Sequence, residues 1–127
     1  MILDVVAADA RFGPGSRDAV RRCLTEGSLI ACEVVWAEIA AAYPATAAAR
    51  TALERLQVGF GPLDRDAALE AGVAFRAYRR AGGTRQRLIA DFLIGAHAGG
   101  VADRLLTRDR GFYRTYFQGL AVLDPSA

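Results

Sequence analysis

Short apolar runs alternate with longer amphipathic segments along the whole chain, without a linker, a repeat or a low-complexity stretch. Segments in which apolar residues recur with the helical period predict helices, and short apolar runs between turn signals predict buried strands. Buried strands that alternate with helices indicate a parallel sheet covered on both faces, so the predicted fold class is α/β. Helices are predicted at about residues 17–26, 33–43, 45–56, 65–81, 88–98 and 111–117, and strands at about 28–32, 58–63, 104–107 and 120–123.

Residues with strong local preferences set the predicted helix boundaries. Ser16 is expected to cap the first helix, because a serine hydroxyl accepts a hydrogen bond from a free backbone N–H in the first turn. Asp64 is expected to cap the long helix that follows it in the same way. Pro44 cannot continue the helix before it, and Gly82-Gly83 is a typical helix end.

The length of 127 residues is that of one ordinary domain, so residues 1–127 are predicted to form a single domain. Hydrophobic residues make up 53% of the chain and charged residues 24%, which is typical of a globular protein. No stretch approaches the roughly 20 apolar residues of a membrane span, and no secretion leader is recognisable. Cys23 and Cys32 have neither CxxC nor zinc-cluster spacing. We expect two buried thiols in a protein of the reducing cytoplasm.

All 16 basic residues are arginine, and lysine is absent. The Ala and Arg bias of a GC-rich genome is one explanation. The absence nevertheless excludes a Walker-type phosphate loop, a Schiff base and a receiver-type phosphoacceptor site, which all need lysine. The net charge of +2 is too small to predict a polyanionic partner by itself. His97 is the only histidine, which excludes a zinc site built on several histidines, and its small apolar neighbours favour a packing role.

Two carboxylates share a helix face with apolar residues. Glu38 lies on the face of Val34 and Ala42, and Asp91 lies on the face of Ile94, so both are expected to lean toward the core. Because an unpaired buried charge is costly, such carboxylates call for a partner. Glu38 is alternatively a tolerated carboxylate at the edge of its face, and Asp91 an early-turn residue favoured by the helix dipole.

A third carboxylate, Asp109, follows the apolar run Leu105-Leu106-Thr107 at the carboxyl end of a predicted strand. Ligands of α/β sheets bind outside these ends, although a turn or helix cap also explains an aspartate there. Carboxylate oxygens are the ligands that Mg²⁺ and Mn²⁺ prefer. Glu38, Asp91 and Asp109 together therefore favour a site for a hard divalent cation.

Three motifs resemble the PIN-domain family, and the likeness is closest to the VapC-type toxins of bacterial toxin–antitoxin pairs. They extend in order along essentially the whole chain: Val35-Trp36-Ala37-Glu38-Ile39-Ala40, then Ile89-Ala90-Asp91-Phe92-Leu93-Ile94-Gly95-Ala96-His97-Ala98, then Leu105-Leu106-Thr107-Arg108-Asp109-Arg110-Gly111-Phe112. The two later motifs are specific, whereas the first alone would be weak.

The resemblance implies a metal-dependent endoribonuclease in which four acidic residues surround Mg²⁺ or Mn²⁺. Glu38, Asp91 and Asp109 match three of the four by motif. Thr107 matches a hydroxyl that lies beside the metal in relatives, although a threonine at a strand end also has a purely structural explanation. The resemblance further implies a homodimer and an antitoxin that inserts a segment into the active-site groove.

The fourth acidic residue of the family follows its first strand, which is central in the sheet, and small polar residues come next. Met1 to Val6 instead match the apolar run after that motif, which makes Asp4 a later helix residue. The rival register, with Asp4 as a ligand, places Val5 and Val6 where small polar residues belong. We therefore expect the first strand and its aspartate to be missing from the chain as written, through a start site set too far downstream.

Arginines surround the two later motifs and are expected to contact RNA phosphates, although each also has an ordinary explanation as a solvated surface residue. The residues concerned are Arg79, Arg80, Arg85 and Arg87 around the Gly82-Gly83-Thr84 loop, and Arg108, Arg110 and Arg114 on either side of Asp109. An alternative function is a truncated, inactive PIN fold that binds an antitoxin or RNA. A small-molecule phosphatase or receiver-like switch is disfavoured by the absence of lysine.

Overall fold

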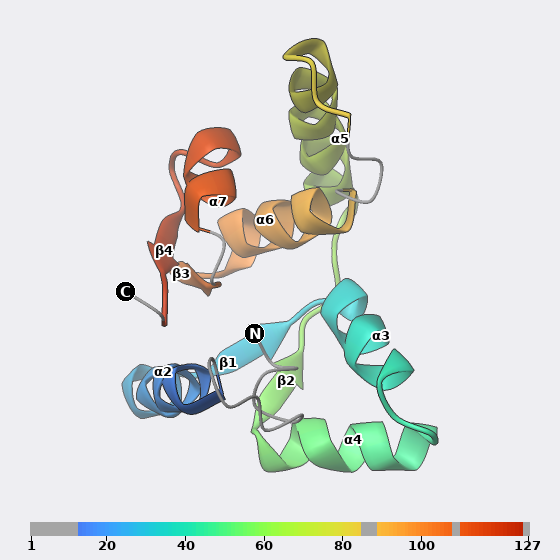
Figure 1. Ribbon diagram of the computed structural model, residues 1–127, viewed down its shortest axis with the longest axis vertical. Helices are drawn as coiled ribbons and strands as arrows, with labels where there is room; N and C mark the ends of the chain where they lie inside the picture. The colour runs from blue at the N-terminus through green and yellow to red at the C-terminus, as the bar shows by residue number, and fades with distance from the viewer. Residues whose placement is uncertain (1–12, 85–88, 108–109, 126–127) are drawn as a thin grey trace. The chain divides into compact units, whose positions relative to one another are not determined.

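The computed structural model describes residues 13–84, 89–107 and 110–125 (Figure 1). The chain divides into two compact units, one of residues 1–62 with 124–127 and one of residues 63–123. Each unit contains its own pair of parallel strands and its own hydrophobic core. Within the described part of the chain, no helix is both long enough and apolar enough to span a membrane.

The described residues of the first unit form three helices and two strands. Strands β1 and β2 pair in parallel, with Leu29 opposite Val58 and Ala31 opposite Phe60. Because parallel strands cannot be joined by a tight hairpin, two helices form the connection between them. The elements are α2 (Gly13–Glu26), β1 (Leu29–Ala31), α3 (Glu33–Ala41), α4 (Thr46–Arg55) and β2 (Val58–Phe60).

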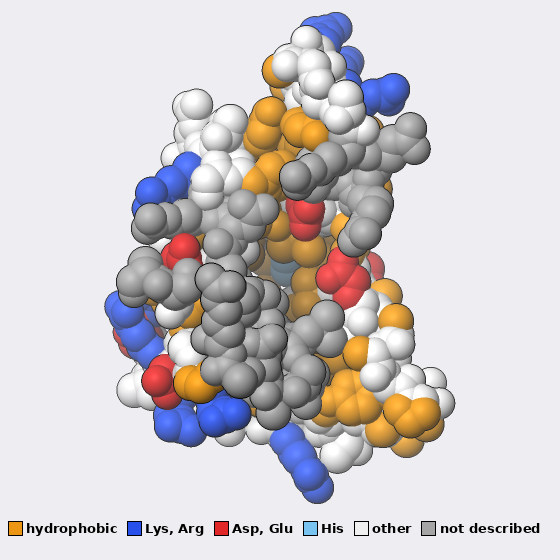
Figure 2. Space-filling view, in the orientation of Figure 1, with side chains coloured by type: hydrophobic (Ala, Val, Ile, Leu, Met, Phe, Trp, Pro, Cys, Tyr) orange, Lys and Arg blue, Asp and Glu red, His pale blue; other side chains and the backbone are white. Residues whose placement is uncertain are grey.

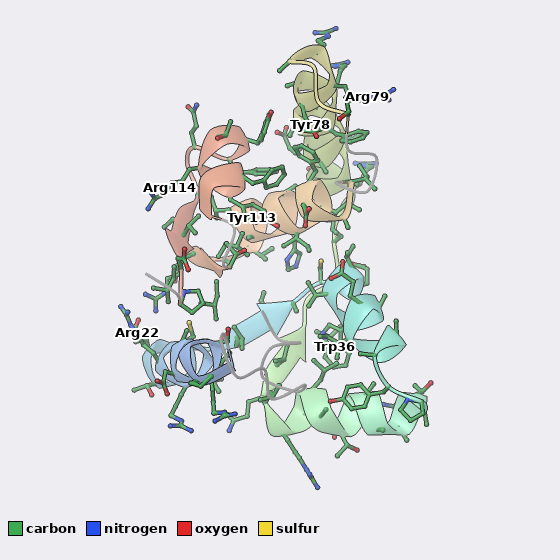
Figure 3. All side chains as sticks on the ribbon, in the orientation of Figure 1. Arg22, Trp36, Tyr78, Arg79, Tyr113 and Arg114 are labelled. Carbon is green, nitrogen blue, oxygen red and sulfur yellow. The ribbon has the colours of Figure 1, made fainter. Side chains whose placement is uncertain are left out.

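The core of this unit forms where α3 and α4 pack on the strand pair. Ile39, Leu53 and Val58 are buried at its centre, one from each of α3, α4 and β2. At its edge, the Trp36 indole N–H donates a hydrogen bond to the Gly59 carbonyl at 3.3 Å (Figure 3). The Trp36 ring also meets Phe60 edge-on, with a centroid separation of 5.7 Å. These contacts attach α3 to the end of β2.

In the described residues of the second unit, three other helices likewise accompany a pair of parallel strands. Strands β3 and β4 pair in parallel, with Arg104 opposite Ala121 and Leu106 opposite Leu123. The backbone N–H of Thr107 extends this ladder by donating to the Leu123 carbonyl at 3.1 Å. The elements are α5 (Arg65–Arg80), α6 (Ile89–Val101), β3 (Arg104–Leu106), α7 (Arg110–Tyr116) and β4 (Ala121–Leu123).

A cluster of aromatic rings forms the core of the second unit. Phe92 of α6 is fully buried at its centre, and Ala71 of α5 is buried beside it. Ring centroids of five neighbours lie between 5.0 and 6.3 Å from that of Phe92, mostly in edge-on or tilted arrangements, which aromatic pairs favour. These neighbours come from α5, from α7 and from the residue after it: Phe75, Tyr78, Phe112, Tyr116 and Phe117.

The predicted helices and strands that lie in the described residues are confirmed to within a few positions, and the parallel pairing is confirmed. The described strands form two separate pairs, however, rather than the one sheet expected from the pattern. The first described helix also begins at Gly13, so Ser16 is a buried residue within it and not its cap. Pro14 explains the early start, because proline suits the first turn of a helix. Cys32 is buried as predicted, whereas Cys23 is half-buried.

Candidate functional site

Glu38 is exposed on α3, and the expectation that it leans toward the core is wrong. The buried residue of this helix is Ile39, with the half-buried Val35 one turn before it. The side of α3 that packs in the core is therefore the one that carries Val35 and Ile39, and Glu38 lies beside it. The structure thus fits the alternative of a carboxylate at the edge of the apolar face. An exposed carboxylate has a low desolvation cost and is accessible to a cation.

Asp91 lies in the first turn of α6 and is half-buried. The next residue, Phe92, is the centre of the aromatic cluster, and Gly95 one turn later is buried. The backbone that carries Asp91 is therefore held rigidly by the core. The position in the first turn also places the carboxylate where the helix dipole stabilises a negative charge, as the alternative explanation proposes.

Thr107 and Asp109 belong to the segment that leaves β3. Thr107 is half-buried, and its ladder hydrogen bond to Leu123 fixes the backbone at the carboxyl end of the strand. Asp109 lies outside the described residues, as does Asp4. The structure thus describes Asp91 and Thr107 in the second unit and Glu38 in the first.

The donor set predicted for the metal contains only oxygen atoms, from the carboxylates of Glu38, Asp91 and Asp109 and the hydroxyl of Thr107. This set matches the preference of Mg²⁺ and Mn²⁺ for hard oxygen ligands. In the part of the chain with described coordinates, no three side chains of His, Cys, Asp or Glu come together as a metal site. The assignment of the three carboxylates as ligands therefore stays a prediction.

His97 is buried in α6, as its apolar neighbours predict. Its Nε2 atom has no hydrogen-bond partner in the part of the chain that the structure describes. A histidine that acts as a general base in a Ser-His-Asp triad needs its ring nitrogens bonded to the nucleophile and to the carboxylate. Among the described residues His97 therefore does not form such a triad.

The arginines predicted to contact RNA fall only partly within the described structure. Arg79 and Arg80 are exposed at the end of α5, and Arg110 is the first residue of α7. Arg85, Arg87 and Arg108 lie outside the described residues.

Residues 5–118 match the sequence profile of the PIN domain, and the chain therefore belongs to the PIN-domain family. The fold is similar to that in the crystal structure of VapBC2 from Rickettsia felis bound to a DNA fragment from their promoter. The two chains share 15% sequence identity with a TM-score of 0.63, over 84% of this chain and 82% of that chain. At this identity the likeness shows the fold alone. No curated protein sequence gives a significant match.

These comparisons confirm the resemblance to PIN domains and the α/β class, with parallel strands flanked by helices. PIN domains are typically nucleases and generally use divalent metal ions. The matched range of residues 5–118 includes Glu38, Asp91, Thr107 and Asp109. Asp4 lies immediately before this range.

Proposed function

We propose that this protein is a metal-dependent endoribonuclease, the toxin of a type II toxin–antitoxin system, which hydrolyses phosphodiester bonds of RNA. The observation that carries the proposal is the PIN match over residues 5–118, within which three acidic motif positions occur in order. The similarity to the fold of VapBC2 supports the toxin assignment. We further propose that residues 1–127 act as one PIN domain, in the cytoplasm.

Glu38, Asp91 and Asp109 are the residues that would hold Mg²⁺ or Mn²⁺ through their carboxylates, and Thr107 would place its hydroxyl beside them. A divalent ion at such a site supplies Lewis acidity, which activates water for attack on phosphorus and offsets charge on the phosphoryl and leaving oxygens. Hydrolysis of this kind leaves 5′-phosphate and 3′-hydroxyl ends.

The protein's own part is to hold these groups in place and to admit the substrate. The buried Phe92 anchors the turn that carries Asp91, and the last hydrogen bond of the β3–β4 ladder anchors Thr107. Cations are needed beside an acidic pocket because RNA is an anion. Arg85, Arg87, Arg108 and Arg110 are proposed to contact phosphates for this reason.

The proposed partners of the chain are the RNA substrate, a cognate antitoxin protein and a second copy of the chain. The fold resembles that of VapBC2, whose structure was solved with a DNA fragment from its promoter, and this resemblance supports an antitoxin partner for the chain. The toxin and the antitoxin of such a pair are expected to form a complex in which the active site is covered.

A second candidate function is that of a catalytically inactive PIN fold that binds an antitoxin or RNA. The resemblance implies four acidic residues around the metal, and three positions of this chain match them by motif. Asp4 lies before the matched residues 5–118 and is not counted among the three. Metal-dependent activity distinguishes the two candidates, since binding alone leaves RNA intact.

The test is cleavage of a structured RNA by the purified chain with Mn²⁺ or Mg²⁺. The Asp91→Asn variant removes a proposed ligand, and Asp103→Asn is the matched control because Asp103 is an exposed carboxylate before β3, outside the motifs. We expect the wild type and Asp103→Asn to cleave and Asp91→Asn to be inactive. Equal activity of all three chains, or of none, overturns the proposed catalytic site.

A further inference from the structure

The positive charge of the chain is concentrated in one short segment. Residues 71–90 contain five arginines and no acidic residue. The remaining 107 residues contain 11 arginines and 14 acidic residues. The segment thus carries a net charge of +5 and the rest of the chain −3, within a total of only +2. Such separation of charge is the electrostatic signature of a surface that binds a polyanion.

Three of these arginines, Arg76, Arg79 and Arg80, lie at the carboxyl-terminal end of α5 and are exposed. Figure 2 shows blue side chains gathered at this end of the helix. The spacing of three and four positions places their side chains on neighbouring parts of one helix face. Within the described residues, none of the three forms an ion pair with a carboxylate.

The helix beneath these arginines is a rigid support. Ala71 and Tyr78 of α5 pack in the aromatic core of the second unit. The guanidinium carbon of Arg79 lies 5.7 Å from the centroid of the Phe75 ring, at a distance typical of a cation–π contact (Figure 3). This contact orients the side chain without neutralising its charge, so that the guanidinium remains available to an anion.

Stabilisation of the helix end does not explain all three charges. Cations favour the last turn of a helix, but Arg76 lies one turn earlier and stands four residues before Arg80. Like charges at this spacing destabilise a helix by about 0.2–0.5 kcal/mol.

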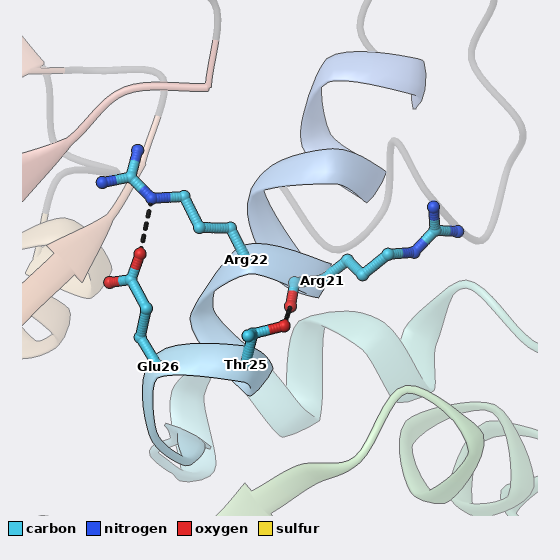
Figure 4. Close-up of polar contacts among 4 residues, drawn as sticks. All are labelled: Arg21, Arg22, Thr25 and Glu26. Carbon is cyan, nitrogen blue, oxygen red and sulfur yellow. Dashed lines mark hydrogen bonds and ion pairs between the residues drawn. The ribbon is translucent and has the colours of Figure 1, made fainter.

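Helix α2 shows the contrasting arrangement. It also carries three exposed arginines, Arg17, Arg21 and Arg22, but acidic residues accompany them. The Arg22 Nε atom lies 2.7 Å from Oε1 of Glu26 in an ion pair (Figure 4). Arg22 is thus partly neutralised by a carboxylate of its own helix, whereas Arg76, Arg79 and Arg80 form no such pair within the described residues.

We propose that Arg76, Arg79 and Arg80 form a binding surface for the phosphate backbone of single-stranded RNA, an inference that rests on the proposed function. A guanidinium can donate two parallel hydrogen bonds to one phosphate, which suits arginine to this contact. The exposed residues from position 76 to 81 are only arginine and alanine. The exposed large apolar residues of α5, Leu69 and Val73, lie nearer the start of the helix than these arginines. The arginine end itself presents charge without a large apolar anchor, which favours a nucleic-acid backbone over a protein partner.

The test measures RNA affinity separately from cleavage. The full chain, in EDTA, is titrated against a fluorescent single-stranded RNA of about 16 nucleotides, a length within the range of known single-strand sites. Dissociation constants are measured between about 50 and 300 mM NaCl. The variant Arg76→Gln/Arg79→Gln/Arg80→Gln is compared with the control Arg17→Gln/Arg21→Gln/Arg22→Gln, which removes the same charge from another exposed helix.

Each phosphate contact to a single strand contributes about 0.7 to the slope of log K against log salt, so the α5 variant should lose about 2 from the slope. The α2 control should keep most of the wild-type slope. Equal slopes for the two variants, or no RNA binding by the wild type, overturn the inference. Binding of poly-glutamate, a model of an acidic protein, is measured in parallel. If the α5 variant keeps the wild-type slope for RNA but no longer binds poly-glutamate, the inference is overturned in favour of an acidic protein partner.

Cleavage by the wild type with Mn²⁺ is measured on the same preparation. If the wild type cleaves RNA but the two variants have equal salt slopes, the proposed binding surface is rejected and the proposed enzyme is not. If the wild type does not cleave RNA but the slopes of the variants differ, the proposed enzyme is rejected and the binding surface is not. Circular dichroism melting of both variants confirms that each is folded.

Discussion

The ring of Phe117 occupies the space that a side chain at Gly95 would need. A Cβ atom built on Gly95 would lie 2.4 Å from Cε2 of the ring, far inside the contact distance of two carbon atoms. Gly95 is one helical turn after Asp91, and Phe117 directly follows α7. The glycine thus allows the helix that carries a proposed metal ligand to pack closely against the end of α7.

Replacement of Gly95 by alanine should destabilise the protein. Overpacking costs about 1–3 kcal/mol, which outweighs the gain of up to about 1 kcal/mol from removing a helical glycine. Gly99→Ala is the control on the same helix, because a Cβ there meets no atom within 4 Å. It should stabilise by about 0.5–1 kcal/mol. Urea unfolding of both variants measures the difference, and a Gly95→Ala protein as stable as Gly99→Ala would contradict the packing described.

The start of α5 depends on the side chain of Asp64. Its Oδ1 accepts a hydrogen bond from the backbone N–H of Ala67 at 2.7 Å. Asp64→Ala should therefore lower the free energy of unfolding by about 0.5–2 kcal/mol. Asp64→Asn should retain most of the stability, since asparagine caps helices about as well. Thermal unfolding compares the two variants, and an equal loss in both would show that charge rather than capping matters at this position.

Metal binding should stabilise the folded chain, because an ion that binds only the folded state shifts the unfolding equilibrium. At Mn²⁺ concentrations about 100 times the dissociation constant, the expected gain is about 2.7 kcal/mol. The gain should be lost in Asp91→Asn and kept in Asp103→Asn. Differential scanning fluorimetry with and without Mn²⁺ measures it. An equal shift in the two variants would mean that Mn²⁺ binds without Asp91.

The sequence predicts the order of the elements well, since each has a local signal. Asp64 is an example, because its capping role depends only on the residues that follow it. The orientation of Glu38 was not predictable in this way. Helix α3 is apolar on most of its surface, so that periodicity does not decide which stripe packs, and contacts with α4 and β2 select Ile39.

Two other features depend on contacts between distant parts of the chain. The close approach of Gly95 and Phe117 joins residues 22 positions apart, and a glycine in a helix shows no partner in the sequence. The strand pattern likewise predicts β1 to β4 but not that their described residues form two separate pairs. Among the candidate site residues, the motifs identify Glu38, Asp91, Thr107 and Asp109, while their arrangement around a metal remains a prediction.

The most direct measurement of the proposed function is the rate of cleavage of a labelled structured RNA as a function of Mn²⁺ concentration, with the product ends identified. The proposed chemistry predicts a rate that rises with Mn²⁺, falls to background in EDTA, and yields 5′-phosphate and 3′-hydroxyl ends. Cleavage that persists in EDTA and leaves 2′,3′-cyclic phosphates, or the absence of cleavage at every Mn²⁺ concentration, would contradict it.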